Sequence, residues 1–102
     1  MEMALTGEPF GAERAYEIGI VNRLTEPGQA LDTARELAAT IARNGPLAVT
    51  ASKQVVQQAG DWTEQEAWQK QGEIIGPVFG SEDAQEGARA FAEKREPEWR
   101  GR

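Results

Sequence analysis

Apolar residues recur at helical spacing through most of this chain, and short motifs rich in glycine and proline separate one such stretch from the next. The clearest stripe consists of Ala30, Leu31, Ala34, Leu37, Ala38 and Ile41. A spacing of three and four residues predicts an amphipathic helix, and Pro27 suits its first turn. Because the stripe is rich in alanine, this helix is expected to pack close to a neighbour. The pattern therefore predicts a mainly α-helical fold.

Two further helices are expected in the middle of the chain. Gly45 and Pro46 suit a helix cap and a first turn. The helix that follows them should bury a face made of Leu47, Ala51 and Val55. Thr63 and Glu66 have the spacing of a capping box, which marks the start of the next helix. We expect Gly76-Pro77 to disturb or end that helix, since proline lacks an N–H donor and crowds the preceding turn.

The last predicted helix begins at Ser81, a favourable N-cap residue, and stops at Pro97. Glu82, Asp83 and Glu86 are expected to serve capping and solvation, and Lys94 and Arg95 should lie in its last turn. Its apolar face is predicted to contain Ala84, Ala88, Phe91 and Ala92. Gly87 in a helix interior costs about 1 kcal/mol relative to alanine, so another group should pack closely against it.

The first residues of the chain predict less regular structure. Met1 to Leu5 is apolar without a capping residue, which suggests a chain that enters in mid-helix. A short helix is expected over residues 12–18, with Gly19 as a left-handed cap. Residues 20–24 are β-branched at their start and predict a short extended piece. A lone strand leaves its backbone groups unpaired, so its partner is expected elsewhere.

Composition excludes several kinds of site. The 102 residues include no cysteine and no histidine. Disulfides and thiolate chemistry are therefore absent, and so are the usual general base at neutral pH and the commonest metal ligand. We predict no metal site. No apolar run approaches the roughly 20 residues of a membrane span, and no signal peptide is visible. A soluble protein of the cytoplasm is expected, without membrane contact.

The net charge of −6 is unevenly distributed. Residues 1–88 contain six basic and fourteen acidic residues and carry −8, whereas residues 89–102 contain five basic and three acidic residues and carry +2. The acidic bulk should repel nucleic acid. The basic end has two interpretations: cations that complement a helix dipole, or a site for a ligand that bears phosphate.

Three segments of the chain carry motifs that can be compared with known families. The first contains Leu5-Thr-Gly7, Ala12-Glu13 and Gly19-Ile-Val-Asn22, the second contains Gly45-Pro46 with Lys53, and the third runs from Phe79 to Trp99 and contains Ala-Phe-Ala-Glu-Lys-Arg. In this order they resemble the enoyl-CoA hydratase/isomerase (crotonase) family: the segment after its active-site region, the next helix and the last helix. The resemblance implies the C-terminal helical part of such an enzyme. Residues 1–24 would end the crotonase-like core, and residues 25–102 would form a helical oligomerisation (trimerisation) region.

The resemblance also implies a function. A complete enzyme of the family would hydrate or isomerise a 2-enoyl-CoA in fatty-acid or related acyl-CoA metabolism, with no cofactor beyond its CoA substrate. No residue here matches the family's catalytic groups, so this chain should have no catalytic residue and no activity alone. It would form homo-oligomers, trimers or hexamers, and help to enclose the CoA nucleotide. The interruption expected at Gly76-Pro77 departs from many relatives.

The resemblance places Phe91 and Lys94 beside the adenine and phosphate of CoA. A ring can stack on adenine and an ammonium can pair with phosphate. The alternative makes Phe91 a core residue and Lys94 a solvated cap, and packing is the expected role of Trp99. Two other functions stay open for the whole chain: a free-standing, non-catalytic helical oligomerisation or interaction module, and a bundle that carries acyl-CoA.

Overall fold

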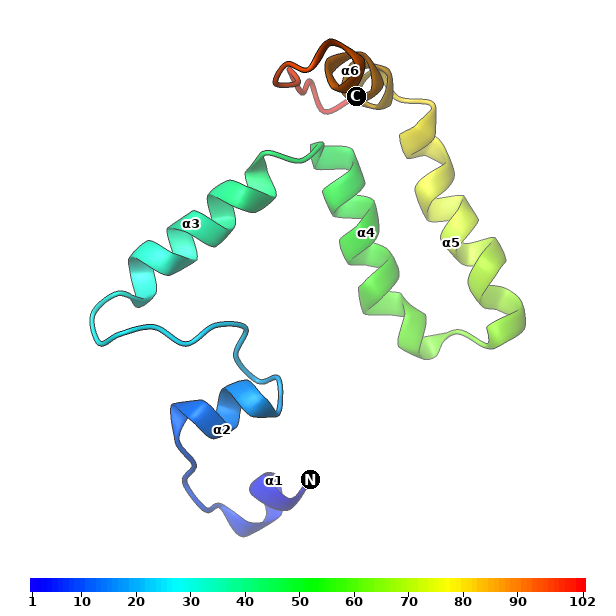
Figure 1. Cartoon of the computed structure of the whole chain (residues 1–102). Coiled ribbons are helices and arrows are strands. Elements are labelled where there is room, and N and C mark those ends of the chain that lie inside the picture. The colour runs from blue at the N-terminus through cyan, green and yellow to red at the C-terminus, as the bar shows by residue number, and fades with distance from the viewer. The chain divides into compact units, whose positions relative to one another are not determined.

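The computed structural model describes all 102 residues and contains helices but no strand. In order they are α1 (Glu2–Thr6), α2 (Ala12–Glu17), α3 (Ala30–Ala42), α4 (Pro46–Gln58), the 3₁₀ turn η1 (Ala59–Asp61), α5 (Glu64–Phe79) and α6 (Glu82–Glu93) (Figure 1). The mainly helical class is thus confirmed. Two compact units comprise Met1–Glu36 and Leu37–Arg102. The proposed division between residues 24 and 25 stays a prediction.

Within the first unit, backbone hydrogen bonds explain why residues 20–24 do not form the extended piece expected from the sequence. The amides of Ile20 and Val21 both donate to the carbonyl of Ala15, at 2.8 and 3.3 Å. Residues 20–22 therefore form a bend that closes α2, followed by irregular backbone, and the expected extended piece does not form a strand. Gly19 takes the predicted left-handed conformation, with φ of 76°.

Pro27 does not begin a helix, contrary to expectation. It lies in a turn closed by a hydrogen bond of 3.0 Å from the amide of Gln29 to the carbonyl of Glu26. Gly28 follows with φ of 86°. Proline and then a glycine of positive φ are the central pair of a type II turn, so the local Pro-Gly preference prevails. α3 begins at Ala30, three residues after Pro27. None of its residues is buried, so its alanine-rich stripe lacks the expected close neighbour.

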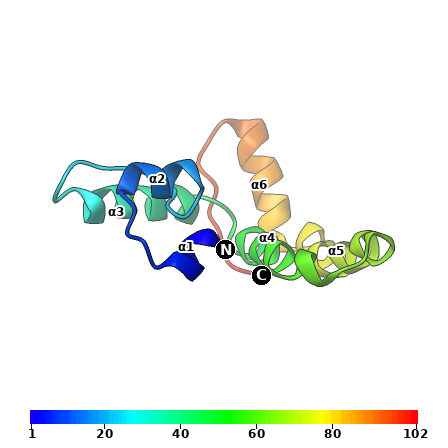
Figure 2. The same ribbon diagram turned by 90° about the horizontal axis from the view of Figure 1, so that it is seen from below.

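In the second unit, α4 and α5 lie side by side and antiparallel, joined through η1 (Figures 1 and 2). The predicted inner face of α4 is confirmed, since Ala51 is buried while Leu47 and Val55 are half-buried. The capping box is also confirmed. The amide of Glu66 donates to Thr63 Oγ1 at 3.3 Å, and the amide of Thr63 donates to Glu66 Oε2 at 3.0 Å.

α5 continues through Gly76 and Pro77 to Phe79, so the expected interruption was wrong. Pro77 stands only two residues before the end of the helix. There its missing N–H deprives one carbonyl, that of Glu73, of a partner, and the helix still continues to Phe79. Ser81 then caps α6 as predicted, because its Oγ accepts a hydrogen bond of 3.0 Å from the amide of Ala84.

α6 ends at Glu93, so Lys94 and Arg95 follow the helix and do not belong to its last turn. Its buried face also differs from the prediction. Ala90 is 2% exposed, whereas Phe91 is 87% exposed and Ala88 and Ala92 lie on the surface. The chain after α6, which we call the tail (residues 94–102), folds back along the helix and selects the face that becomes buried.

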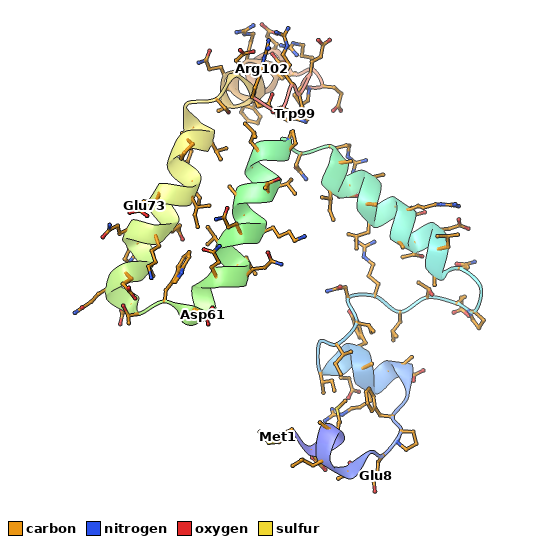
Figure 3. All side chains as sticks on the ribbon, turned by 180° about the vertical axis from the view of Figure 1, so that it is seen from behind. Met1, Glu8, Asp61, Glu73, Trp99 and Arg102 are labelled. Carbon is orange, nitrogen blue, oxygen red and sulfur yellow. The ribbon has the colours of Figure 1, made fainter.

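Trp99 anchors the tail. Its Nε1 donates a hydrogen bond of 2.9 Å to the carbonyl of Arg43. A Cβ added at Gly87 would lie 3.1 Å from the Trp99 ring, and one added at Gly45 would lie 3.6 Å from it. The close packing predicted at Gly87 and the packing role of Trp99 are therefore confirmed. Figure 3 shows Trp99 and Arg102 beside α6, at the opposite end of the α4–α5 pair from Asp61.

Replacing Trp99 by alanine should lower the free energy of unfolding by about 2 kcal/mol, since both ring packing and a hydrogen bond are lost. Urea unfolding followed by far-UV circular dichroism measures this change. The matched control is Phe91→Ala, because that ring is exposed and its loss should change stability by no more than about 0.5 kcal/mol. Equal losses in the two variants would contradict the anchoring role of Trp99.

Candidate functional site

Asp83, in the first turn of α6, binds the end of the tail. Its side chain accepts hydrogen bonds from the backbone amides of Arg100, at 2.7 Å, and Gly101, at 2.9 Å. Its own amide donates to the carbonyl of Arg102 at 3.1 Å. The residue is only 4% exposed. A carboxylate expected to serve solvation is therefore a buried acceptor that holds the C-terminal backbone.

Glu86, one turn further along α6, binds the beginning of the tail. It accepts a bidentate pair from the Arg95 guanidinium, at 2.6 and 3.1 Å, and a third bond of 3.0 Å from the amide of Glu98. The Arg95 hydrogen bond, and next the amide of Glu98, lower the pKa of Glu86 to about 2. Hydrogen bonding to Glu86 and Glu93 raises the pKa of Arg95.

Lys94 joins α6 to the tail through a left-handed residue, with φ of 54° and ψ of 41°. The amide of Arg95 donates to the carbonyl of Ala90 at 3.0 Å, and the amide of Lys94 donates to that of Phe91 at 3.3 Å. This pair of bonds is the Schellman motif, whose left-handed position is usually glycine. Lys94 is the only residue other than glycine with a positive φ in this chain.

The two residues predicted to contact CoA, Phe91 and Lys94, therefore lie at one end of α6 and both are exposed. The Phe91 ring does not enter the core of this chain. The ammonium of Lys94 makes none of the salt bridges in this structure, in contrast to the guanidinium of Arg95. An exposed aromatic ring and, three residues later, an exposed cation suit an anionic, aromatic ligand, and binding stays a prediction.

Two hollows flank α6. One of about 270 Å³ is mainly apolar and lies beside Trp99, Phe79 and Leu47. The other, about 260 Å³, is polar and is lined by Glu82, Asp83 and Glu86 with Arg89 and Arg100. The carboxylates of this second hollow already accept hydrogen bonds from the tail. No group of three or more acidic side chains is placed to hold a metal ion.

The sequence did not reveal the attachment of the tail. Asp83 and Glu86 are three residues apart, which puts them on one face of a helix, but their partners lie nine to eighteen residues further along the chain. No periodicity connects such positions.

None of the helices is long and apolar enough to span a membrane.

Comparison with known proteins gives a consistent result. The family model for enoyl-CoA hydratase/isomerase matches residues 1–102. A carnitinyl-CoA dehydratase from Salmonella arizonae is 42% identical over 104 residues, which cover 98% of this chain and 40% of that protein. The crystal structure of a probable enoyl-CoA hydratase/isomerase from Mycobacterium abscessus is 60% identical, with a TM-score of 0.95. An enoyl-CoA hydratase from Mycobacterium tuberculosis is 52% identical, with a TM-score of 0.98.

Each of these two crystal structures is matched over 100% of this chain and 40% of its own. The similarity thus extends over the whole chain, to proteins whose names refer to CoA esters. The chain belongs to the enoyl-CoA hydratase/isomerase family and corresponds to the C-terminal helical part, as the resemblance predicted. It spans about 40% of the length of the relatives it matches.

The lowered pKa of Glu86 predicts a dependence of stability on acid. Between its unperturbed pKa of 4.5 and its folded pKa of about 2, the unfolded chain binds more protons than the folded chain, so stability falls as the pH falls through this range. Above pH 4.5 the contribution is fully present. Urea midpoints measured from pH 6 to pH 2 should decrease less steeply for Glu86→Gln than for the unchanged chain. We call the hydrogen bonds that Glu86 accepts from Arg95 and Glu98 the clamp. Parallel curves for the two chains would contradict its contribution to stability.

Proposed function

We propose that this chain contributes CoA binding and homo-oligomer contacts to an enzyme that hydrates or isomerises a 2-enoyl-CoA. The relatives are named as hydratases and a dehydratase of CoA esters, which supports this substrate class. The catalytic groups would belong to the part of such an enzyme that has no counterpart here, so the chain alone should be inactive. The proposal includes a place in cytoplasmic fatty-acid or related acyl-CoA metabolism and no cofactor besides the CoA substrate.

The observation that carries the CoA contact is the backbone of Lys94. The other positive-φ positions of the chain are occupied by Gly7, Gly19, Gly28 and Gly101. A side chain in the left-handed region costs roughly 1–2 kcal/mol, and residues in sparsely populated backbone conformations cluster at ligand sites. A lysine in this position therefore supports a role for its ammonium that glycine could not perform.

The chemistry of the two side chains fits the nucleotide end of CoA. The ammonium of Lys94 is a compact charge that pairs with phosphate, and the exposed ring of Phe91 offers a face for adenine. Both groups would be remote from the reacting thioester. Binding energy from such remote contacts, when it is equal in ground and transition states, lowers KM and leaves kcat unchanged.

Replacing Lys94 by glycine should separate stability from function. The free energy of unfolding should increase by about 0.5 kcal/mol, because glycine relieves the left-handed strain. The affinity for CoA should decrease about tenfold, because one phosphate contact is lost. Isothermal titration with CoA and urea unfolding measure the two effects. Lys53→Ala removes the same charge from α4 and should keep the affinity, whereas an unchanged affinity in Lys94→Gly would contradict the CoA contact.

A non-catalytic oligomerisation module is the second candidate function. It is favoured by large apolar side chains in the second unit that face solvent, among them Val56, Trp68 and Phe79, each 78 or 79% exposed. Exposed apolar surface of this kind marks interaction sites. The same surface serves the first proposal, since an enzyme part that assembles needs it too.

Sedimentation velocity tests the assembly that both candidates require. We expect a discrete trimer or hexamer at micromolar concentration, and Trp68→Glu should shift it toward the monomer, because a charge cannot be buried unpaired at modest cost. Glu64→Gln on the same helix is the control and should leave the oligomer intact. A well-folded monomer in the unchanged chain would argue against oligomerisation.

A further inference from the structure

Arg95, which follows Lys94, is held by hydrogen bonds from both its side chain and its backbone amide. Its guanidinium binds Glu86 through two bonds, at 2.6 and 3.1 Å, and Glu93 through one of 2.6 Å. The same guanidinium donates to the carbonyl of Glu96 at 3.0 Å. Its backbone amide closes the Schellman motif on Ala90. The peptide that links Lys94 to Arg95 is therefore held by its own hydrogen bond to the helix.

The network also divides the roles of two neighbouring cations. Arg95 has its charge balanced by Glu86 and Glu93, so its donors already have partners within this chain. Lys94 lies beside it without an acidic partner. An incoming phosphate would therefore meet the ammonium of Lys94 and would have to displace two carboxylates to reach Arg95. The arrangement selects one cation as the ligand group and makes the other structural.

Glu86 also holds the backbone of the tail beyond Arg95. Besides Arg95, Glu86 accepts the amide of Glu98 at 3.0 Å. One carboxylate on α6 thus holds the tail on the C-terminal side of Lys94, while the helix itself holds the N-terminal side. With both flanks fixed, the left-handed conformation of Lys94 is the one that connects them, although a lysine prefers others.

We propose that Glu86 and Arg95 are positioning residues for the ligand contact of Lys94: they hold its backbone in the left-handed conformation and so direct its ammonium toward the phosphate groups of CoA. This inference rests on the CoA-binding role proposed for Lys94. It predicts that Glu86 influences CoA affinity only through Lys94, although it does not contact the ligand.

A double-mutant cycle in the full 102-residue chain tests this dependence. CoA affinity is measured by isothermal titration for the unchanged chain, Glu86→Gln, Lys94→Gly and the double variant. Glu86→Gln should lower the affinity about fivefold when Lys94 is present and less than about twofold when glycine replaces it, because glycine adopts the left-handed conformation unaided. Arg95→Lys keeps the charge but loses the bidentate geometry, so it should behave as Glu86→Gln does and serves where the glutamine variant folds poorly.

Glu96→Gln is the matched control. It removes one negative charge two residues from Lys94 but leaves the clamp intact, so it should not lower the affinity. A loss on Glu86→Gln of equal size with and without the Lys94→Gly change would show a general structural effect and overturn the positioning role. An unchanged affinity in both Glu86→Gln and Arg95→Lys, with weak binding by Lys94→Gly, would overturn the positioning role alone. Unchanged binding by Lys94→Gly, or no CoA binding by the unchanged chain, would overturn the proposed contact and this inference together.

Discussion

The tail folds back onto α6, and this contact determines which face of α6 is buried in the second unit. Two carboxylates one turn apart, Asp83 and Glu86, accept three backbone amides of the tail between them. Hydrogen bonds to a charged acceptor contribute more than neutral ones, and Asp83 is buried, where an unpaired carboxylate would be strongly unfavourable. The carboxylates and the tail are therefore mutually dependent. The same return carries Trp99 to its contacts with Gly87 and Arg43.

This dependence on polar attachment agrees with the small apolar core. The buried apolar residues are alanines, Ala15, Ala51 and Ala90, and no large side chain is fully enclosed. Since hydrophobic burial is the dominant favourable contribution to folding, helices with so little of it gain from contacts beyond this chain. The relatives, of whose length the chain matches about 40%, have additional protein that could supply such contacts. Trp68 and Phe79, each 78% exposed, are among the large apolar side chains that would gain from such burial.

Local signals in the sequence predicted local structure well. The capping box at Thr63 and Glu66, the cap at Ser81 and the inner face of α4 depend on residues three or four positions apart, and all were confirmed. Proline was less reliable because its effect depends on position. Pro77 is tolerated near the end of a helix, and Pro27 combines with a following glycine into a turn.

The candidate site shows the limit of such prediction. Phe91 and Lys94 came from a resemblance, whereas their supporting contacts, from Glu86 to Arg95 and Glu98, could not be inferred from spacing. The resulting geometry explains how a lysine can occupy a left-handed position that is usually glycine. In our proposal the hydrogen bonds of Glu86 with Arg95 and Glu98 keep the left-handed conformation of Lys94 populated, which makes the strain compatible with a stable helix end. Stability and the ligand contact that we propose thus make opposite demands at Lys94, and in this proposal the contacts of Glu86 allow the chain to meet both.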